Sequence, residues 1–278
     1  MSLHGDTTTT TAERSTVTKR PSLSERFGTD LPRIGVGAGS LAAGAVAWDL
    51  YARSADPLFA PRASSIWSAF VGLLGDSEFW QSYATTLRPF LWGWAAAMVV
   101  GLTFGLVIGM SSTIRALAGP HLSFFNALPV STLVPAIVIA FGIDTVARST
   151  VVFLFAVIEV TLTAASGVQY VDRDLLDMGR SFGLGRVRRF TRIILPGSAP
   201  AIAAAVRIGT ARAVVGMVVM ELLLVSVGVG KLISRYRDGF DAPRLYAVVL
   251  SLAVFALFVN GLMRLVEGRA QPWKDDEA

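Results

Sequence analysis

The sequence contains no cysteine, only two histidines and few charged residues. Without cysteine the chain can form no disulfide, no thiol nucleophile and no cysteine-ligated metal centre. His4 lies in a polar N-terminal stretch and His121 lies near an expected loop, so we expect neither a metal site nor another cofactor. Charged residues make up 16% of the chain, against roughly 25% in ordinary soluble domains. This deficit argues against a soluble enzyme.

Hydrophobic residues are abundant, at 53% of the 278 residues, and apolar runs of membrane-spanning length recur along the chain. The net charge of +5 could suggest a nucleic-acid partner. No array of aromatic and basic residues accompanies that charge, and basic loops also orient membrane proteins. We therefore expect an all-α, polytopic membrane protein in contact with the lipid bilayer and with no nucleic acid.

About six transmembrane helices are expected within a membrane domain of residues 34–266. The predicted spans are residues 34–48, 90–110, 117–142, 146–168, 199–226 and 245–266. Residues 57–88 are less apolar and have a helical period, which is typical of a helix along the membrane surface or against the bundle.

The two ends of the chain are polar. Residues 1–30 are rich in Thr, Ser and charge and cannot bury enough apolar surface to order themselves, which predicts a disordered tail. Residues 267–278 form a second polar tail. The first span is short and follows five basic residues, so a cleaved signal peptide is the alternative at that position. We favour a retained span because the preceding polar region is unusually long for a signal peptide.

Basic residues are distributed unequally between the expected loops. With the N-terminus in the cytoplasm, fifteen Lys and Arg residues fall in the inner segments and eight in the outer segments. Because inner loops of membrane proteins carry an excess of Lys and Arg, this count predicts a multi-pass protein of the cell inner (plasma) membrane with both termini cytoplasmic.

Two of the predicted spans carry distinctive small or imino residues. In the second span, small residues recur at every fourth position and would let another helix approach closely. They are Gly93, Ala97, Gly101, Gly105 and Gly109. In the third span, Pro129 and Pro135 each remove a backbone donor, so we expect a bent or interrupted helix. Such a kink either lines a pathway or is merely structural.

Residues 169–197, between the fourth and fifth spans, are too long for a simple turn and mix charged with apolar residues. Gly183 and Gly185 interrupt this segment in the middle, where a helix end and a turn favour glycine. The pattern predicts two short amphipathic helices around a glycine turn, projecting from the bundle as a docking surface. The alternative is a solvated loop that happens to be amphipathic.

The same segment contains a spaced motif. Its residues are Asp177, Met178, Gly179, Gly183, Ile193, Leu195 and Pro196. The spacing resembles the EAA motif of the transmembrane permease subunits of binding-protein-dependent ABC importers, which reads Glu, Ala, Ala, three residues, Gly, nine residues, Ile, one residue, Leu, Pro. The first three positions depart from that pattern. The resemblance extends from about Leu58 to Trp273 and is strongest to the nitrate, sulfonate and taurine permease group.

The resemblance implies that residues 169–197 form a coupling helix that inserts into a groove on a separate cytoplasmic ATPase. Asp177 would supply a charged contact, Gly183 the turn and Pro196 a break before the fifth span, with Gly179, Ile193 and Leu195 completing the motif. The ATPase must be another polypeptide, since this sequence contains no phosphate-binding loop. The nearest similar stretch, Gly228 to Lys231, lacks the first glycine and the hydroxyl residue.

The implied function is therefore transport rather than catalysis, and we expect no catalytic residues. Further implied partners are an extracytoplasmic substrate-binding protein and a second permease, in a homodimer or a heterodimer. The group moves small organic or inorganic anions such as sulfonates and nitrate, and close relatives move vitamin precursors. An ion-coupled secondary carrier is the alternative, although no inverted repeat supports it. Motifs of an intramembrane enzyme are absent from the sequence.

Four ionisable residues lie within the predicted spans: Glu159, Arg207, Arg212 and Glu221. Charges at membrane depth are costly and usually paired or exposed to an aqueous path. Arg207 and Glu221 are near the span ends, where snorkelling or interface contacts could suffice. Arg212 and Glu221 lie on opposite faces of one helix, so we expect Arg212 to pair with Glu159 or to join a shared polar cluster. That pair either fixes helix register or borders the translocation path.

Overall fold

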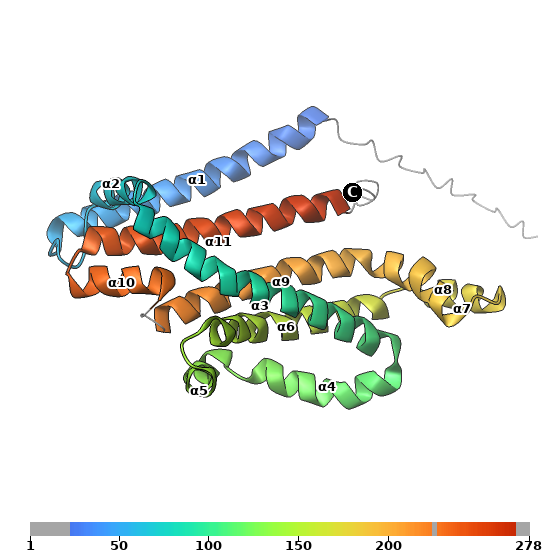
Figure 1. Cartoon of the computed structure of the whole chain (residues 1–278). Coiled ribbons are helices and arrows are strands. Elements are labelled where there is room, and N and C mark those ends of the chain that lie inside the picture. The colour runs from blue at the N-terminus through green and yellow to red at the C-terminus, as the bar shows by residue number, and fades with distance from the viewer. Residues whose placement is uncertain (1–22, 224–226, 271–278) are drawn as a thin grey trace, which may run out of the picture. The chain divides into compact units, whose positions relative to one another are not determined.

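The computed structural model describes residues 23–223 and 227–270, and all regular structure within those ranges is helical (Figure 1). The α-helices are α1 Leu23–Ser54, α2 Ala63–Leu74, α3 Ser77–Met110, α4 Ser112–Ala127, α5 Val134–Phe141, α6 Thr145–Gln169, α7 Arg173–Ser181, α8 Arg186–Arg189, α9 Leu195–Leu223, α10 Gly228–Asp238 and α11 Ala242–Ala270. A 3₁₀ turn, η1 Val130–Leu133, and a π-helical turn, η2 Phe190–Ile194, complete the set. The predicted all-α fold is confirmed.

The described residues divide into two compact units at Tyr51 and Ala52. The first unit contains most of α1, which includes the predicted span 34–48. Because α1 begins at Leu23, the end of the predicted disordered tail is helical, and residues 1–22 of that tail lie outside the described residues. Residues 271–278 of the predicted C-terminal tail also lie outside them.

The number of membrane spans differs from the prediction. By length and composition, four helical runs of the described chain can cross a membrane: α3, α6, Arg186–Leu223 and Ala242–Leu265. A fifth crossing arises if α4 and the helical segment after it count as one span. The expected number of about six is therefore not confirmed, because α1 is not among the helices that are long and apolar enough.

The third predicted span is broken at its prolines. Helix α4 ends at Ala127, Pro129 precedes the 3₁₀ turn η1, and Pro135 lies in the first turn of α5. A proline there loses no helical hydrogen bond, because the first N–H groups of a helix have no intrahelical partner. The two halves are bent by 78°. The interruption predicted from Pro129 and Pro135 is confirmed.

Helix α6 packs closely against both α3 and α9. Along α3, the small residues of the predicted stripe are buried and face α6. A Cβ atom added at Gly105 would lie 2.7 Å from the carbonyl oxygen of Thr161, and one added at Gly109 would lie 2.8 Å from that of Ala165. On the other side of α6, an added Cβ at Gly216 of α9 would lie 2.9 Å from Phe155 Cβ. The small-residue stripe is therefore a helix-packing surface, as predicted.

Replacing Gly105 with alanine tests this packing. The added methyl group would press on the backbone of α6, which cannot move as a side-chain tip can, so we expect the free energy of unfolding to fall by about 1–3 kcal/mol. The matched control is Gly119→Ala in α4, where no atom lies within 4 Å of an added Cβ and helix propensity favours alanine by about 1 kcal/mol. Thermal unfolding of the purified proteins in detergent compares the two. Equal unfolding temperatures for both variants would contradict the proposed packing role.

Candidate functional site

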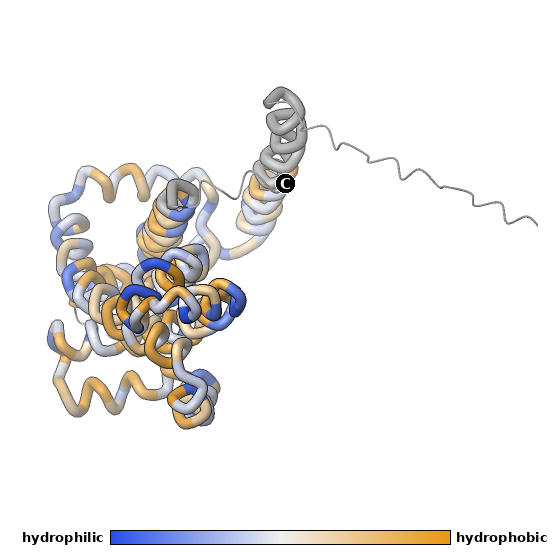
Figure 2. Tube along the Cα trace, turned by 90° about the vertical axis from the view of Figure 1, so that its right-hand side faces the viewer, coloured by the Kyte–Doolittle hydropathy of each residue, from blue (hydrophilic) through white to orange (hydrophobic). Residues whose placement is uncertain are grey.

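Helices α7 and α8 form a projection at one end of the second unit, which begins at Ala52 (Figure 1). Figure 2, which faces that end, shows hydrophilic and hydrophobic residues interleaved along it. Asp172 caps α7, since its Oδ1 accepts a hydrogen bond from the Asp174 amide at 2.9 Å. Two short helices therefore form where the sequence predicts them.

A glycine turn ends α7. Gly183 has φ +70°, and its amide donates to the Arg180 carbonyl at 2.9 Å. The Leu184 amide donates to the Gly179 carbonyl, also at 2.9 Å. This pair of bonds is the Schellman arrangement, in which a residue with positive φ closes the helix end. No atom lies within 4 Å of a Cβ added at Gly183. The backbone conformation with positive φ therefore favours glycine at this position, and crowding by neighbours does not. The predicted role of Gly183 in the turn agrees with this geometry.

The motif residues at the two ends of the projection contact each other. Gly179 is buried, and a Cβ added there would lie 2.7 Å from Ile193 Cδ1 and 3.4 Å from Leu184 Cδ1. Gly179 and Ile193 are therefore far apart in the motif but pack against each other, because α7 folds back on η2. A contact of this kind makes the projection a folded unit, which the alternative of a solvated loop does not describe.

The break expected at Pro196 does not occur. The chain is helical from Arg186 to Leu223, with the π turn η2 immediately before α9, and the Leu195 amide donates to the Phe190 carbonyl. A π turn widens the helix by one residue, so the missing N–H and the ring of Pro196 are accommodated without ending it. Leu195 and Pro196 begin α9 and continue the run from α8.

The outer surface of the projection is apolar and uncovered in the described chain. Leu175, Met178, Phe182 and Val187 are each more than half exposed, with Phe182 at 80%. Asp177 is also exposed and forms an ion pair with Arg180 at 2.8 Å. Exposed apolar side chains gathered with charges are typical of a protein-docking surface.

The four ionisable residues predicted in the spans do not form one cluster. Arg212 Nη2 lies 2.7 Å from Glu159 Oε1, which is the pair that the sequence predicts. Arg207 Nε lies 2.8 Å from Glu267 Oε2 of α11. Glu221 is only 2% exposed and pairs with Arg148 of α6. Of the two alternatives, the pair of Glu159 with Arg212 is therefore present and a cluster shared by all four is not, while Glu221 is buried in the helix bundle and does not snorkel.

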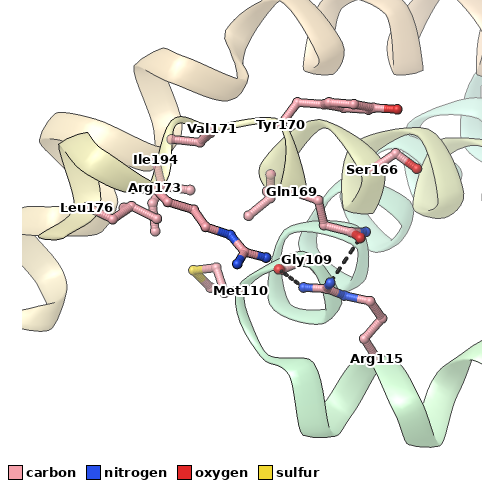
Figure 3. Close-up of a pocket in the computed structure, with 11 residues that line it drawn as sticks. Gly109, Met110, Arg115, Ser166, Gln169, Tyr170, Val171, Arg173, Leu176 and Ile194 are labelled. Carbon is pink, nitrogen blue, oxygen red and sulfur yellow. Dashed lines mark hydrogen bonds between the residues drawn. The ribbon is translucent and has the colours of Figure 1, made fainter.

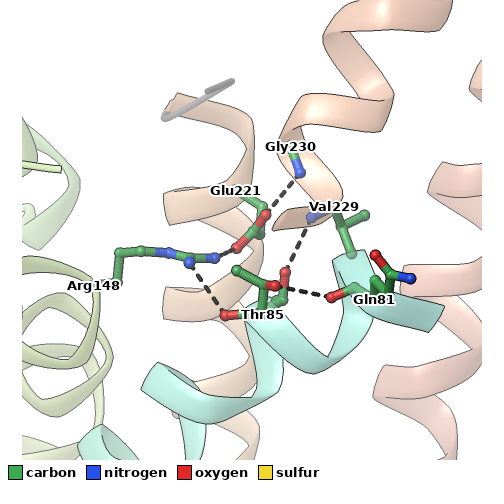
Figure 4. A network of polar contacts seen from close by, with 7 residues as sticks. Gln81, Thr85, Arg148, Glu221, Val229 and Gly230 are labelled. Atoms are coloured by element: carbon green, nitrogen blue, oxygen red, sulfur yellow. Dashed lines mark hydrogen bonds and ion pairs between the residues drawn. The ribbon is translucent and has the colours of Figure 1, made fainter. Parts of the chain in front are cut away.

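The pair of Arg148 and Glu221 is the centre of a buried network (Figure 4). Arg148 Nη1 also donates to the Thr85 carbonyl of α3 at 3.2 Å. The second carboxylate oxygen of Glu221 accepts from the Gly230 amide at 2.7 Å, and the Thr86 hydroxyl accepts from the Val229 amide at 3.0 Å. Four helices, α3, α6, α9 and α10, meet at these bonds.

Sequence reasoning missed Arg148, which lies at the start of the predicted span 146–168 and was counted among the eight basic residues of the outer segments. The only available signal was that Glu221 needed a partner of opposite charge at the same end of the bundle. The segment that resembled part of a phosphate loop, Gly228 to Lys231, begins α10 in this network. Gly228 has φ +66°, and a Cβ added there would lie 2.5 Å from Thr86 Oγ1. Among the described residues, no group of three or more His, Asp or Glu residues could hold a metal ion.

We expect Arg148→Gln to lower the free energy of unfolding by about 3–5 kcal/mol, because Glu221 would be left as a buried, unpaired charge. Arg244→Gln is the control, since Arg244 forms an exposed pair with Asp241 at 3.1 Å and exposed pairs contribute about 0–1 kcal/mol. Chemical denaturation in detergent measures both. Similar small losses in the two variants would show that the buried network does not hold the four helices together.

A cavity of about 320 Å³ adjoins the pair of Glu159 and Arg212. The broken span supplies one wall of this cavity, from Phe125 to Ser131, and α6 supplies Phe155 beside Glu159. The side chain of Arg212 is 54% exposed and that of Glu159 is 24% exposed. A partly exposed ion pair therefore lies beside the break between α4 and α5, where Pro129 and Pro135 interrupt the predicted span.

Comparison with known proteins gives a consistent result. The sequence profile described as "Binding-protein-dependent transport system inner membrane component" matches residues 97–272. A probable ABC transporter permease protein of Brucella abortus (strain 2308) is 26% identical over 205 residues, which are 74% of this chain and 82% of the relative. The taurine transport system permease protein of Escherichia coli (strain K12) is 25% identical over 222 residues, covering 78% and 81%. The nitrate import permease protein of Leptolyngbya laminosa is 26% identical over 195 residues, covering 70% and 69%.

A similar fold occurs in a solved structure of the MetNI methionine ABC transporter in an inward-facing conformation. The TM-score is 0.57 at 16% sequence identity, and the match covers 66% of this chain and 92% of the solved chain. At this identity the likeness concerns the fold alone.

Proposed function

The chain belongs to the family of inner membrane components of binding-protein-dependent transport systems, and we propose that it forms the translocation path for a small solute with an anionic group, such as a sulfonate or nitrate. It is a permease subunit of an ABC importer and a transport component, so the alternative of an ion-coupled secondary carrier falls away. The relatives named for taurine and nitrate transport support the anionic substrate class.

The observation that carries the coupling proposal is the projection formed by α7 and α8. It is folded through Gly179 and Ile193, closed at Gly183, continuous with α9 through Leu195 and Pro196, and apolar on its outer surface. These features suit a rigid element that transmits the closure of a cytoplasmic ATPase to the membrane helices. Asp177, exposed beside that surface, would add a charged contact.

The remaining partners follow from the same proposal. An extracytoplasmic substrate-binding protein would deliver the solute, and a second permease, most simply another copy of this chain, would complete the path. The excess of Lys and Arg on the side of α7 and α8 supports a cytoplasmic projection and cytoplasmic termini.

Gly183→Val tests the coupling role. Valine is β-branched and disfavours positive φ, so the turn should rearrange and the projection should dock poorly. We expect ATP hydrolysis stimulated by the binding protein to fall about tenfold in the reconstituted complex, a loss equivalent to about 1.4 kcal/mol. Copurification of the ATPase should weaken in parallel.

Gly185→Val is the matched control. Gly185 is also uncrowded, but its φ of −63° and ψ of 163° suit valine. This variant should keep stimulated hydrolysis and ATPase binding. Undiminished coupling in Gly183→Val would remove the glycine turn from the mechanism.

The accessible pair of Glu159 and Arg212 supports a role at the translocation path. Because Arg212 is more than half exposed, the fold should not depend strongly on the pair. We expect Arg212→Gln to assemble with its partners and to lower solute uptake about tenfold, a loss equivalent to about 1.4 kcal/mol.

Exchanging the two charges separates a path role from a purely structural one. The double variant Glu159→Arg with Arg212→Glu keeps an ion pair at this position. If the pair only fixes helix register, the exchange should restore uptake to the level of the unmodified chain. If the path uses a fixed charge, the exchanged complex should assemble and still fail to transport, which is the result we expect.

A further inference from the structure

A second cavity, of about 470 Å³, lies where α3 and α6 end and α4 and α7 begin (Figure 3). Arg115 of α4 and Arg173 of α7 both contribute to its walls, with Gly109, Gln169 and Tyr170. This cavity is distinct from the one beside Glu159 and is not required by the coupling role described above.

The cavity walls carry two guanidinium groups and no carboxylate. In Figure 3 the Arg173 side chain extends toward the end of α3, on the side where Arg115 lies. Asp172 and Asp174 flank Arg173 in the sequence, but neither lines the cavity, and Asp172 caps α7. Like charges that face one space without a counter-charge repel each other, and an anion between them removes that repulsion.

Helix capping explains only one of these arginines. Arg115 donates to the Gly109 carbonyl at 2.7 Å and to Gln169 Oε1 at 2.9 Å, which satisfies groups at the ends of α3 and α6. Its Nε remains buried without a hydrogen-bond partner among the described residues. Arg173 forms no hydrogen bond or ion pair with the described residues through its guanidinium. Arg173 is therefore a surplus cation, and it lies beside an arginine that is already fixed in place.

We propose that this cavity binds an oxyanion of the phosphate type between Arg115 and Arg173. A guanidinium presents several donors in one plane and matches phosphate oxygens with two parallel hydrogen bonds. Arg115 is held by the two helix ends before any ligand arrives, so only Arg173 must order on binding. The ligand would connect α4 of the bundle to α7 of the projection.

The phosphate group can come from a lipid or from solution. The cavity lies at the ends of two membrane-spanning helices, which is the level of lipid headgroups, and basic pockets at this level bind anionic lipids. Tyr170 on the rim is 89% exposed, and tyrosine is enriched at the membrane interface. A free phosphate or sulfate would use the same two guanidinium groups.

The first experiment uses the full-length permease purified in detergent. Thermal unfolding is followed while sodium phosphate is added, with sodium chloride at matched ionic strength as the reference. Arg173→Gln should weaken the apparent phosphate affinity about tenfold, the usual effect of losing a charge-assisted pair of hydrogen bonds. Arg173→Lys keeps the charge without the planar donors and should show an intermediate affinity.

A second arm places the same proteins in vesicles of phosphatidylcholine, with or without phosphatidylglycerol. The anionic lipid should raise the unfolding temperature of the unmodified protein and have a smaller effect on Arg173→Gln. The control in both arms is Arg188→Gln on α8, which removes the same charge from the projection but does not line the cavity. It should respond as the unmodified protein does.

The outcomes separate the two sources. A response to phosphatidylglycerol alone identifies a lipid headgroup, and a response to free phosphate identifies a soluble anion, provided that Arg173→Gln abolishes it and Arg188→Gln does not. Three results overturn the proposal: no response of the unmodified protein in either arm, an equal response to chloride, or equal losses in Arg173→Gln and Arg188→Gln. None of these measurements depends on transport, so they stand apart from the proposed function.

Discussion

The close approach of α3 to α6 is the constraint on which the packing of α3, α6 and α9 depends. Because glycine or alanine at every fourth residue leaves little side chain between the two helices, the backbone of α3 lies against that of α6. Helix α6 is then free to pack its other side against α9. This packing places Arg148 of α6 opposite Glu221 of α9. It also places Glu159 of α6 opposite Arg212 of α9. Both ion pairs therefore follow from helix packing.

The two pairs on α6 differ in exposure, and this difference separates the roles that we propose for them. The pair of Arg148 and Glu221 is buried and bonds to the amides at the start of α10, so it acts on the fold. The pair of Glu159 and Arg212 lies beside the broken span, where the chain leaves a cavity. A buried charge left unpaired costs about 3–5 kcal/mol, whereas Arg212 is 54% exposed in the described chain. Under the proposed function, the exposed pair of Glu159 and Arg212 is therefore the one that exchanges its partner for a solute.

The sequence was sufficient to predict those features that depend on neighbouring residues of the same segment. The stripe of small residues, Pro129 with Pro135, and the glycine turn at Gly183 each act on their own backbone, and each occurs as predicted. The pairing of Glu159 with Arg212 also followed, because helix periodicity and depth left few alternatives. The partner of Glu221 did not, since 73 residues separate it from Arg148 and only packing brings the two together. The expected number of about six spans is not confirmed, because α1 is not among the described helices that meet the length and composition of a membrane span.

The continuity of the helix through Pro196 matters more for the mechanism than the break that was expected there. A break would let the projection move while α9 stayed in place. Instead α8, the π turn and α9 form one helical run from Arg186 to Leu223, and Ile193 in that turn holds α7 through Gly179. Under the proposed function, a displacement of α7 by the ATPase must therefore move α9 as a lever. Arg212 lies on that lever and Glu159 on the neighbouring α6, so sliding one helix past the other would open the ion pair at the cavity.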